Sequence, residues 1–215
     1  MSKVAFKSFM LGLAAVAWLA ATPAPSRADL IQNGSFETDS VPIGHVTLSV
    51  GSTDIPGWTV VGPGLKSNEN IDHIGGTWSP SHGNCSLDLN GFYKTGGVEQ
   101  GFDTVVGQSY LVQFDMAGNP YPYPETRTMR VSALGGGTQS EDFSFNVTDK
   151  TREAMGWTTM EWTFVADDIH TTLQFMSTVT GDKLDAWGPA LDNVRVSAVP
   201  VPGAALLGVM GLGFA

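Results

Sequence analysis

The stretch from Asn84 to Asn119 reads NCSLDLNGFYKTGGVEQGFDTVVGQSYLVQFDMAGN, and its pattern decides the fold. Apolar side chains recur at every second position in three short runs, which are separated by segments rich in Gly and Asn. Such alternation, bounded by turn residues, is typical of half-buried strands. The stretch therefore predicts three strands, with inward residues Leu87 and Leu89, then Val98, Gln100 and Phe102, then Tyr110, Val112, Phe114 and Met116.

The same alternation continues through residues 29–198, which we predict to form one domain of about eight to ten short strands. We place the first strand at Leu30–Glu37 and the last at Ala190–Ala198. The only helical turn is expected at Asp149–Met155, and no amphipathic helix is longer than about two turns. The sequence thus predicts an all-β fold, an antiparallel β-sandwich of the jelly-roll type.

Residues 1–28 have the pattern of a signal peptide. Lys3 and Lys7 precede an apolar run from Phe9 to Ala21, and Ser26-Arg27-Ala28 places small residues where a signal peptidase needs them. The alternative is a membrane anchor, but the run is shorter than the roughly 20 residues that a spanning helix requires. We expect export and cleavage after Ala28.

The charge of the exported chain excludes some partners. Cleavage after Ala28 reduces the 11 basic residues to 8 and leaves all 21 acidic residues, which gives a formal charge of −13. Such a chain is a poor ligand for nucleic acid or anionic lipid, whereas divalent cations remain compatible with it. Cys85 is the only cysteine, so no intramolecular disulfide can form.

Residues 199–215 form a separate C-terminal element. Val199-Pro200-Val201-Pro202 is an extended spacer, and the uncharged, apolar segment Gly203–Ala215 follows it. Thirteen residues are too few to cross a bilayer as a helix. The tail is either a processed segment, a span that the sequence cuts short, or a final element packed on the domain.

A cation site is predicted where the two ends of the domain meet. Asp192 has the same parity as Val194 and Val196, so it tends toward the core, where an unpaired carboxylate is costly. A Ca²⁺ ion shared with Glu37 would remove that cost, provided the first and last strands are neighbours. The alternative is that Asp192 accepts backbone N–H bonds and Glu37 is solvated.

A carbohydrate-binding face is the second candidate. Flat aromatic rings with polar edges suit sugar rings, and several lie in or beside predicted loops. Tyr121 and Tyr123 are held out by alternating prolines, whereas Trp58 and Trp187 fit better as caps on the sandwich ends. The predicted ligand-binding residues are Tyr121, Tyr123, Trp78, Tyr93 and Asn119, with further hydrogen bonds expected from Asn90, Gln100 and Asp185.

Catalysis is not expected. A glycosidase needs two carboxylates in different environments, but the mid-strand carboxylates read as solvated surface. The sequence contains neither a His-Glu-x-x-His nor a Gly-x-Ser-x-Gly motif, and its four histidines are scattered. The outward carboxylates considered are Asp88, Glu99, Asp115 and Glu161.

Seven short motifs occur in an order that resembles the DUF642 family and its bacterial choice-of-anchor C relatives. They are residues 33–37 (NGSFE), 56–58 (PGW), 86–91 (SLDLNG), 97–100 (GVEQ), 114–120 (FDMAGNP), 156–159 (GWTT) and 188–194 (GPALDNV). The resemblance implies a galactose-binding-domain-like sandwich that associates with polysaccharide. It also implies a structural calcium between Glu37 and Asp192. The cysteine pairs of plant members are missing here.

The tail at 199–215 resembles a PEP-CTERM sorting signal without its basic cluster, which implies a Gram-negative host and an exosortase-like processing enzyme. We expect a secreted, non-catalytic protein of the cell surface or extracellular matrix that binds polysaccharide and meets the membrane only through this tail. The alternatives are a structural matrix or adhesion protein with protein partners, and a glycan hydrolase.

Overall fold

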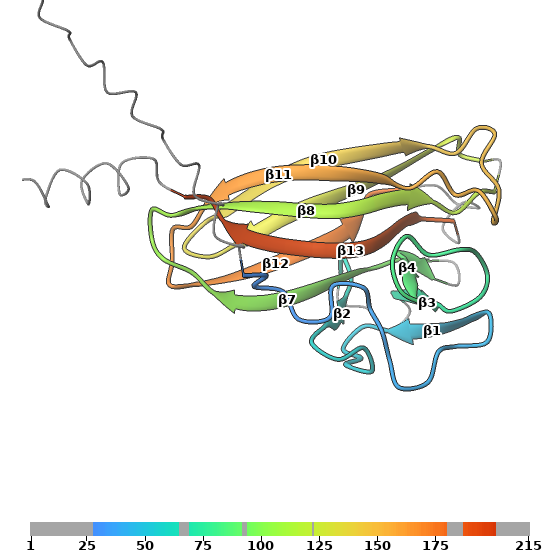
Figure 1. Ribbon diagram of the computed structural model, residues 1–215, viewed down its shortest axis with the longest axis horizontal. Coiled ribbons are helices and arrows are strands. Elements are labelled where there is room, and N and C mark those ends of the chain that lie inside the picture. The colour runs from blue at the N-terminus through green and yellow to red at the C-terminus, as the bar shows by residue number, and fades with distance from the viewer. Residues whose placement is uncertain (1–27, 65–68, 92–93, 122, 180–186, 201–215) are drawn as a thin grey trace, which may run out of the picture.

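The computed structural model describes residues 28–64, 69–91, 94–121, 123–179 and 187–200, which form two packed antiparallel sheets and no helix (Figure 1). No segment of this part of the chain could cross a membrane as a helix. The all-β antiparallel sandwich predicted from the sequence is confirmed.

The first sheet has six strands in the order β1-β3-β4-β13-β8-β11. Their bounds are β1 His45–Ser49, β3 Asn70–Ile74, β4 Ser86–Asp88, β13 Pro189–Ala198, β8 Ser109–Gly118 and β11 Thr158–Val165.

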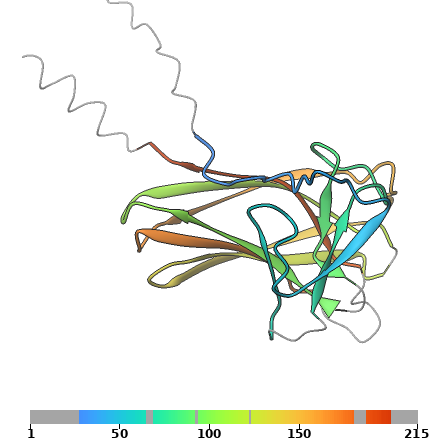
Figure 2. The ribbon, with the colours of Figure 1, turned by 90° about the horizontal axis from the view of Figure 1, so that it is seen from below.

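The second sheet has five strands in the order β10-β9-β12-β7-β2, and a small two-stranded sheet pairs β5 with β6. Their bounds are β10 Thr138–Asn146, β9 Thr126–Leu134, β12 His170–Ser177, β7 Gly97–Asp103, β2 Thr59–Val61, β5 Asn90–Gly91 and β6 Lys94–Thr95. Figure 2 shows the two large sheets as separate layers.

The core lies between these layers and is built from the alternating positions that the sequence predicts. On β8, Val112, Phe114 and Met116 are fully buried. Phe114 meets Phe175 of the opposite sheet edge to face, with ring centroids 5.1 Å apart. Trp58 is also buried, and its indole N–H donates to the Asn33 carbonyl at 2.9 Å, so the ring caps the core as expected.

The predicted first strand at Leu30–Glu37 is wrong. The segment runs beside β13, where the Leu30 N–H donates to Val196 O and Gly34 O accepts from the Val194 N–H, both at 2.9 Å. It is not a strand, because Asn33 and Phe36 have left-handed backbone angles (φ 52° and 57°) that break the extended conformation. The first strand is β1. The helical turn expected at Asp149–Met155 is likewise absent, and the segment is irregular.

A bulge in β13 changes which face Asp192 occupies. Asp192 pairs with Asp115 of β8, and the register shifts before Arg195, with Asn193 in the left-handed region (φ 51°). Beyond the shift, Val196 pairs with Val112 and points into the core. The predicted core-facing parity of Asp192 is therefore wrong. It shares the outer face with Asp115 and is buried there because another segment covers it.

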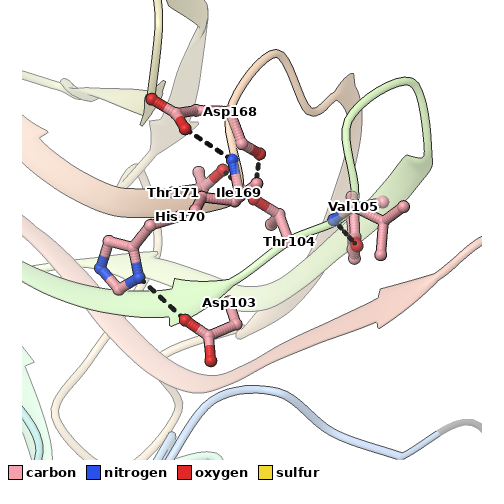
Figure 3. A network of polar contacts seen from close by, with 8 residues as sticks. Asp103, Thr104, Val105, Asp168, Ile169, His170 and Thr171 are labelled. Carbon is pink, nitrogen blue, oxygen red and sulfur yellow. Dashed lines mark hydrogen bonds and ion pairs between the residues drawn. The ribbon is translucent and has the colours of Figure 1, made fainter.

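The two ends of the sandwich differ. The turns between β7 and β8 and between β11 and β12 meet at one end. There Thr104 donates its hydroxyl to Asp168 O at 2.7 Å, and His170 contacts Asp103 at 3.2 Å (Figure 3). Both ends of the described chain lie at this end (Figure 1). Residues 119–125 join β8 to β9 at the opposite end.

The close approach of residues 30–37 to β13 gives a stability prediction. A Cβ on Gly34 would lie 1.9 Å from the Val194 carbonyl oxygen. We therefore expect Gly34→Ala to lower the free energy of unfolding by about 1–3 kcal/mol, as measured by urea titration. Gly76→Ala is the matched control, because its nearest neighbour lies at 3.4 Å. Equal stability of the two variants would contradict the packing described here.

Candidate functional site

The loop at 119–125 is held from below by a buried arginine. Arg127 of β9 is completely buried. Its guanidinium donates to Asn119 O at 2.8 Å, to Tyr121 O at 2.7 Å and to Pro124 O. Prolines inside the loop restrict it further. The backbone carbonyls of Asn119, Tyr121 and Pro124 are thus held in position although they take no part in a sheet.

This loop presents the two predicted tyrosines at the surface, with Tyr121 48% exposed and Tyr123 65% exposed. Tyr121 stacks on half-buried Trp187 with ring centroids 3.7 Å apart and planes 8° from parallel. One face of Tyr121 is therefore covered, and the pair forms a stiff aromatic wall.

Two hollows flank the loop. The first, of about 330 Å³, is lined by Asn119, Pro120, Tyr121, Lys150, Thr151, Arg152 and Glu153. The second, of about 240 Å³, is lined by Pro120, Tyr123, Glu125, Val147, Thr148, Asp149 and Lys150. Pro120 and Lys150 line both, so the hollows adjoin. The Val147 N–H donates to Glu125 O at 2.8 Å and ties their two walls together.

A buried carboxyl lies beneath the loop. Asp88 of β4 accepts from the Asn119 side-chain amide at 2.8 Å, from the Asn90 N–H at 3.0 Å and from the Gly188 N–H at 2.9 Å. Burial raises the pKa of Asp88 to about 7, although these hydrogen bonds oppose the rise. Asn119 thus lines the first hollow and also anchors it, because its amide nitrogen is held by Asp88.

Other predicted ligand-binding residues lie elsewhere. Trp78 is only 5% exposed and donates its indole N–H to Ser86 Oγ at 2.9 Å, so it has no free ring face for a sugar. Asn90 is buried. The side-chain amide of Gln100 makes two hydrogen bonds to the backbone of Gln32. The predictions for Tyr93 and Asp185 lie outside the described residues.

Sequence reasoning missed the second wall of the site, residues 147–153. Most of it falls in Asp149–Met155, which the sequence predicts as a helical turn, and nothing local marks it as a neighbour of the proline loop. Its polarity is the only signal in the sequence, and the contact arises because the chain after β10 returns to the end where β9 begins.

The carboxylates of the predicted calcium site both bind one loop. Glu37 Oε1 accepts from the Asn84 and Cys85 N–H groups at 2.7 and 2.9 Å. Asp192 Oδ2 accepts from the Ser81 and His82 N–H groups at 2.8 and 2.9 Å. This loop is the segment that covers Asp192, whose pKa burial raises to about 6.

The Ser81 and His82 donors agree with the alternative that the sequence left open, in which Asp192 accepts backbone N–H bonds. Among the described residues, no group of three or more His, Cys, Asp or Glu side chains is arranged to hold a metal ion. Calcium at Glu37 and Asp192 would therefore need other oxygen ligands, such as backbone or side-chain carbonyls and water. It stays a prediction.

The carboxylates considered for catalysis divide into two kinds. Glu99 and Glu161 accept side-chain amide hydrogen bonds, from Gln174 at 2.9 Å and Gln113 at 2.6 Å. Asp88 and Asp115 are buried, which corrects their assignment to solvated surface. Burial opposes ionisation of Asp115, but hydrogen bonds from Asn193, Thr159 and Ser81 outweigh it and lower its pKa.

The buried carboxyls predict an unusual pH dependence. Asp88 and Asp192 have folded pKa values of about 7 and about 6, above the value of roughly 3.9 for an unfolded Asp. Between these limits the native state holds protons that the unfolded state has lost. Their contribution to stability therefore falls as pH rises from 4 to 7.

We expect Asp88→Asn to match the wild type near pH 4.5 and to gain about 1–3 kcal/mol relative to it by pH 7.5, because Asn cannot ionise. Urea unfolding across this range measures the difference. Asp142→Asn is the control. A hydrogen bond from Arg130 lowers the pKa of Asp142, so replacing Asp142 leaves the dependence of stability on pH unchanged in this range. Parallel curves for Asp88→Asn and wild type would refute the burial argument.

Known proteins resemble this chain in sequence and in fold. The family described as protein of unknown function DUF642 matches residues 29–197. Halomucin of Haloquadratum walsbyi is 30% identical over 184 residues, a match that covers 82% of this chain and 2% of halomucin. The chain thus spans a very small part of that relative.

Among solved structures, an arabinose-bound α-L-arabinofuranosidase has a TM-score of 0.52 at 13% identity over 80% of this chain and 26% of its own. A carbohydrate-binding module in complex with β-1,4-galactotriose has a TM-score of 0.46 at 14% identity over 80% of this chain and 99% of its own. At these identities the likeness concerns the fold alone. The DUF642 family model matches most of the length of this chain, residues 29–197, so the chain belongs to the DUF642 family.

Proposed function

We propose that this protein is a secreted, non-catalytic polysaccharide-binding protein whose site is the pair of hollows beside residues 119–125. The observation that carries the proposal is the exposure of Tyr121 and Tyr123 on a loop that Arg127 fixes from beneath. A rigid ring that is already in place loses little conformational freedom when a sugar stacks on it. The mixture of tyrosine, amide, hydroxyl and charged groups suits a ligand rich in hydroxyl groups.

Binding is favoured over hydrolysis by the position of the perturbed carboxyls. Asp88 has its pKa raised to about 7, as a general acid needs, but it is enclosed by the N–H groups of Asn90, Asn119 and Gly188. It does not line either hollow. A proton donor must reach the glycosidic oxygen, and Asp88 is separated from the hollows by the residues that bind it.

Export and surface attachment are part of the proposal. The signal peptide at 1–28 would direct the chain out of the cytoplasm. The apolar tail at 199–215, with its PEP-CTERM-like motif, would hold it at the membrane of a Gram-negative cell until an exosortase-like enzyme processed it. The alternative is a matrix or adhesion protein with protein partners. The observation in its favour is that Val46 of β1 and the preceding Val41 and Ile43 are exposed.

The site predicts that loss of an exposed tyrosine weakens glycan binding. A polysaccharide array with the purified full chain identifies the best ligand, and calorimetry then compares variants. We expect Tyr123→Ala to bind it about tenfold more weakly, and Tyr123→Phe to lose less because the ring remains. Ile169→Ala, a truncation of a 73% exposed side chain at the opposite end, is the control. Undiminished binding by Tyr123→Ala would move the site elsewhere.

Calcium at Glu37 and Asp192 is a separate proposal, which rests on the family resemblance. A bound ion stabilises the native state by mass action. We therefore expect a higher melting temperature in millimolar calcium than in EDTA, and no such difference for Glu37→Gln. Identical melting of the wild type under both conditions would leave the N–H bonds as the full account of these carboxylates.

A further inference from the structure

Two of the basic side chains that are neither buried nor ion-paired in the described part of this acidic protein line the hollows; these two are Lys150 and Arg152, and the other two are Lys94 and Arg195. The chain that remains after cleavage has 8 basic residues. Arg127 is buried, and Arg130 pairs with Asp142 at 2.7 Å. In the part of the chain that the structure describes, neither Lys150 nor Arg152 has a carboxylate oxygen within 4.0 Å. Both line the hollow beside Tyr121.

The Lys150 side chain and the backbone that carries Arg152 are held in place by their surroundings. The Lys150 side chain lies over Gly156, where a Cβ would come within 3.0 Å of Nζ. Gly156 has φ 71°, so the position favours glycine and leaves room for the lysine stem. The turn that carries Arg152 is closed by two hydrogen bonds between Thr151 and Ala154, at 3.1 and 3.2 Å. Arg152 O also accepts from the Ser79 N–H at 3.0 Å.

The hollows differ in charge. The hollow beside Tyr121 contains Lys150 and Arg152 against one carboxylate, Glu153. The hollow beside Tyr123 shares Lys150 but contains two carboxylates, Glu125 and Asp149. Lys150 and Arg152 offer an anion charge-assisted hydrogen bonds at contact distance, where salt screens the repulsion from the rest of the −13 chain, whereas carboxylates accept hydrogen bonds from sugar hydroxyls. The two hollows are therefore suited to chemically different neighbours on one glycan chain.

We propose that they are adjoining subsites for a glycan that contains acidic sugars. The carboxylate of a uronic acid unit would bind Lys150 and Arg152 beside the Tyr121–Trp187 stack. The next unit would place its hydroxyl groups against Glu125 and Asp149 and its ring against Tyr123. This inference rests on the proposed glycan-binding function and adds the class of sugar.

The test compares polymers that differ only in charge. The purified full chain is titrated with alginate and polygalacturonate, and with each polymer after reduction of its carboxyl groups to alcohols. We expect the acidic forms to bind at least about tenfold more tightly, because charge-assisted hydrogen bonds are lost on reduction. The preference should weaken with added salt, as partly exposed charge pairs do.

Variants test the acidic subsite separately from the glycan site. Lys150→Gln with Arg152→Gln should remove the preference for the acidic form, and each single substitution should weaken it. Arg130→Gln, which like each single substitution removes one positive charge but lies on the outer face of β9, should keep it. Equal binding of acidic and reduced polymers, with Tyr123 still required, would overturn the acidic subsite and leave the glycan site standing. Binding of none of the four polymers would overturn the acidic subsite, while the polysaccharide array and Tyr123→Ala decide the glycan site. Tighter binding of a sulfated galactan than of either polyuronate would also overturn the carboxylate assignment.

Discussion

The buried guanidinium of Arg127 is the interaction on which the surface site depends. Burying a cation is costly unless hydrogen bonds and opposite charge compensate for the lost water. Here burial lowers the pKa of Arg127 to about 10, while the nearby Asp88 carboxyl raises it. Three carbonyls of the 119–125 loop supply the hydrogen bonds. If the loop left its position, the guanidinium would lose these acceptors, so core stability and loop conformation are coupled.

This coupling also explains the order of the elements around the loop. Asn119 links it to β4 through Asp88 and to β13 through the Gly188 carbonyl, which accepts the Asn119 N–H at 3.0 Å. Trp187, the residue before Gly188, then stacks on Tyr121. Two segments about 70 residues apart in sequence therefore form one aromatic wall. The wall stands at the end of β8 opposite to both ends of the described chain, roughly 30 Å away for a ten-residue strand. A protein tethered by its C-terminal segment would present this wall away from the tether.

The sequence was sufficient for the fold because period-2 alternation survives wherever one face of a strand is buried, as on β7 and β8. It failed where a few residues leave the extended conformation. Asn33 and Phe36 break the predicted first strand, and Asn193 reverses the face of Asp192. Tyr121 and Tyr123 could be placed outside because prolines flank them. Trp78 could not be told from a loop aromatic, since its partner Ser86 becomes a neighbour only in the folded chain. Lys150 and Arg152 were missed for the same reason.

The cost of buried charge is concentrated under the loops of this protein. Asp88, Asp192 and Arg127 are all buried, and each is satisfied mainly by backbone groups of an irregular segment. A sandwich without disulfides has no covalent constraint on such segments, and apolar contacts do not fix the direction of a backbone carbonyl or N–H. A buried charge does fix the direction of these backbone groups, because every misplaced dipole leaves the charge uncompensated. Burial raises the pKa values of the two carboxyls, and the N–H groups of the loops oppose that rise. These hydrogen bonds therefore orient the loop backbones, and oriented loops are what a binding surface made of exposed rings and unpaired cations requires.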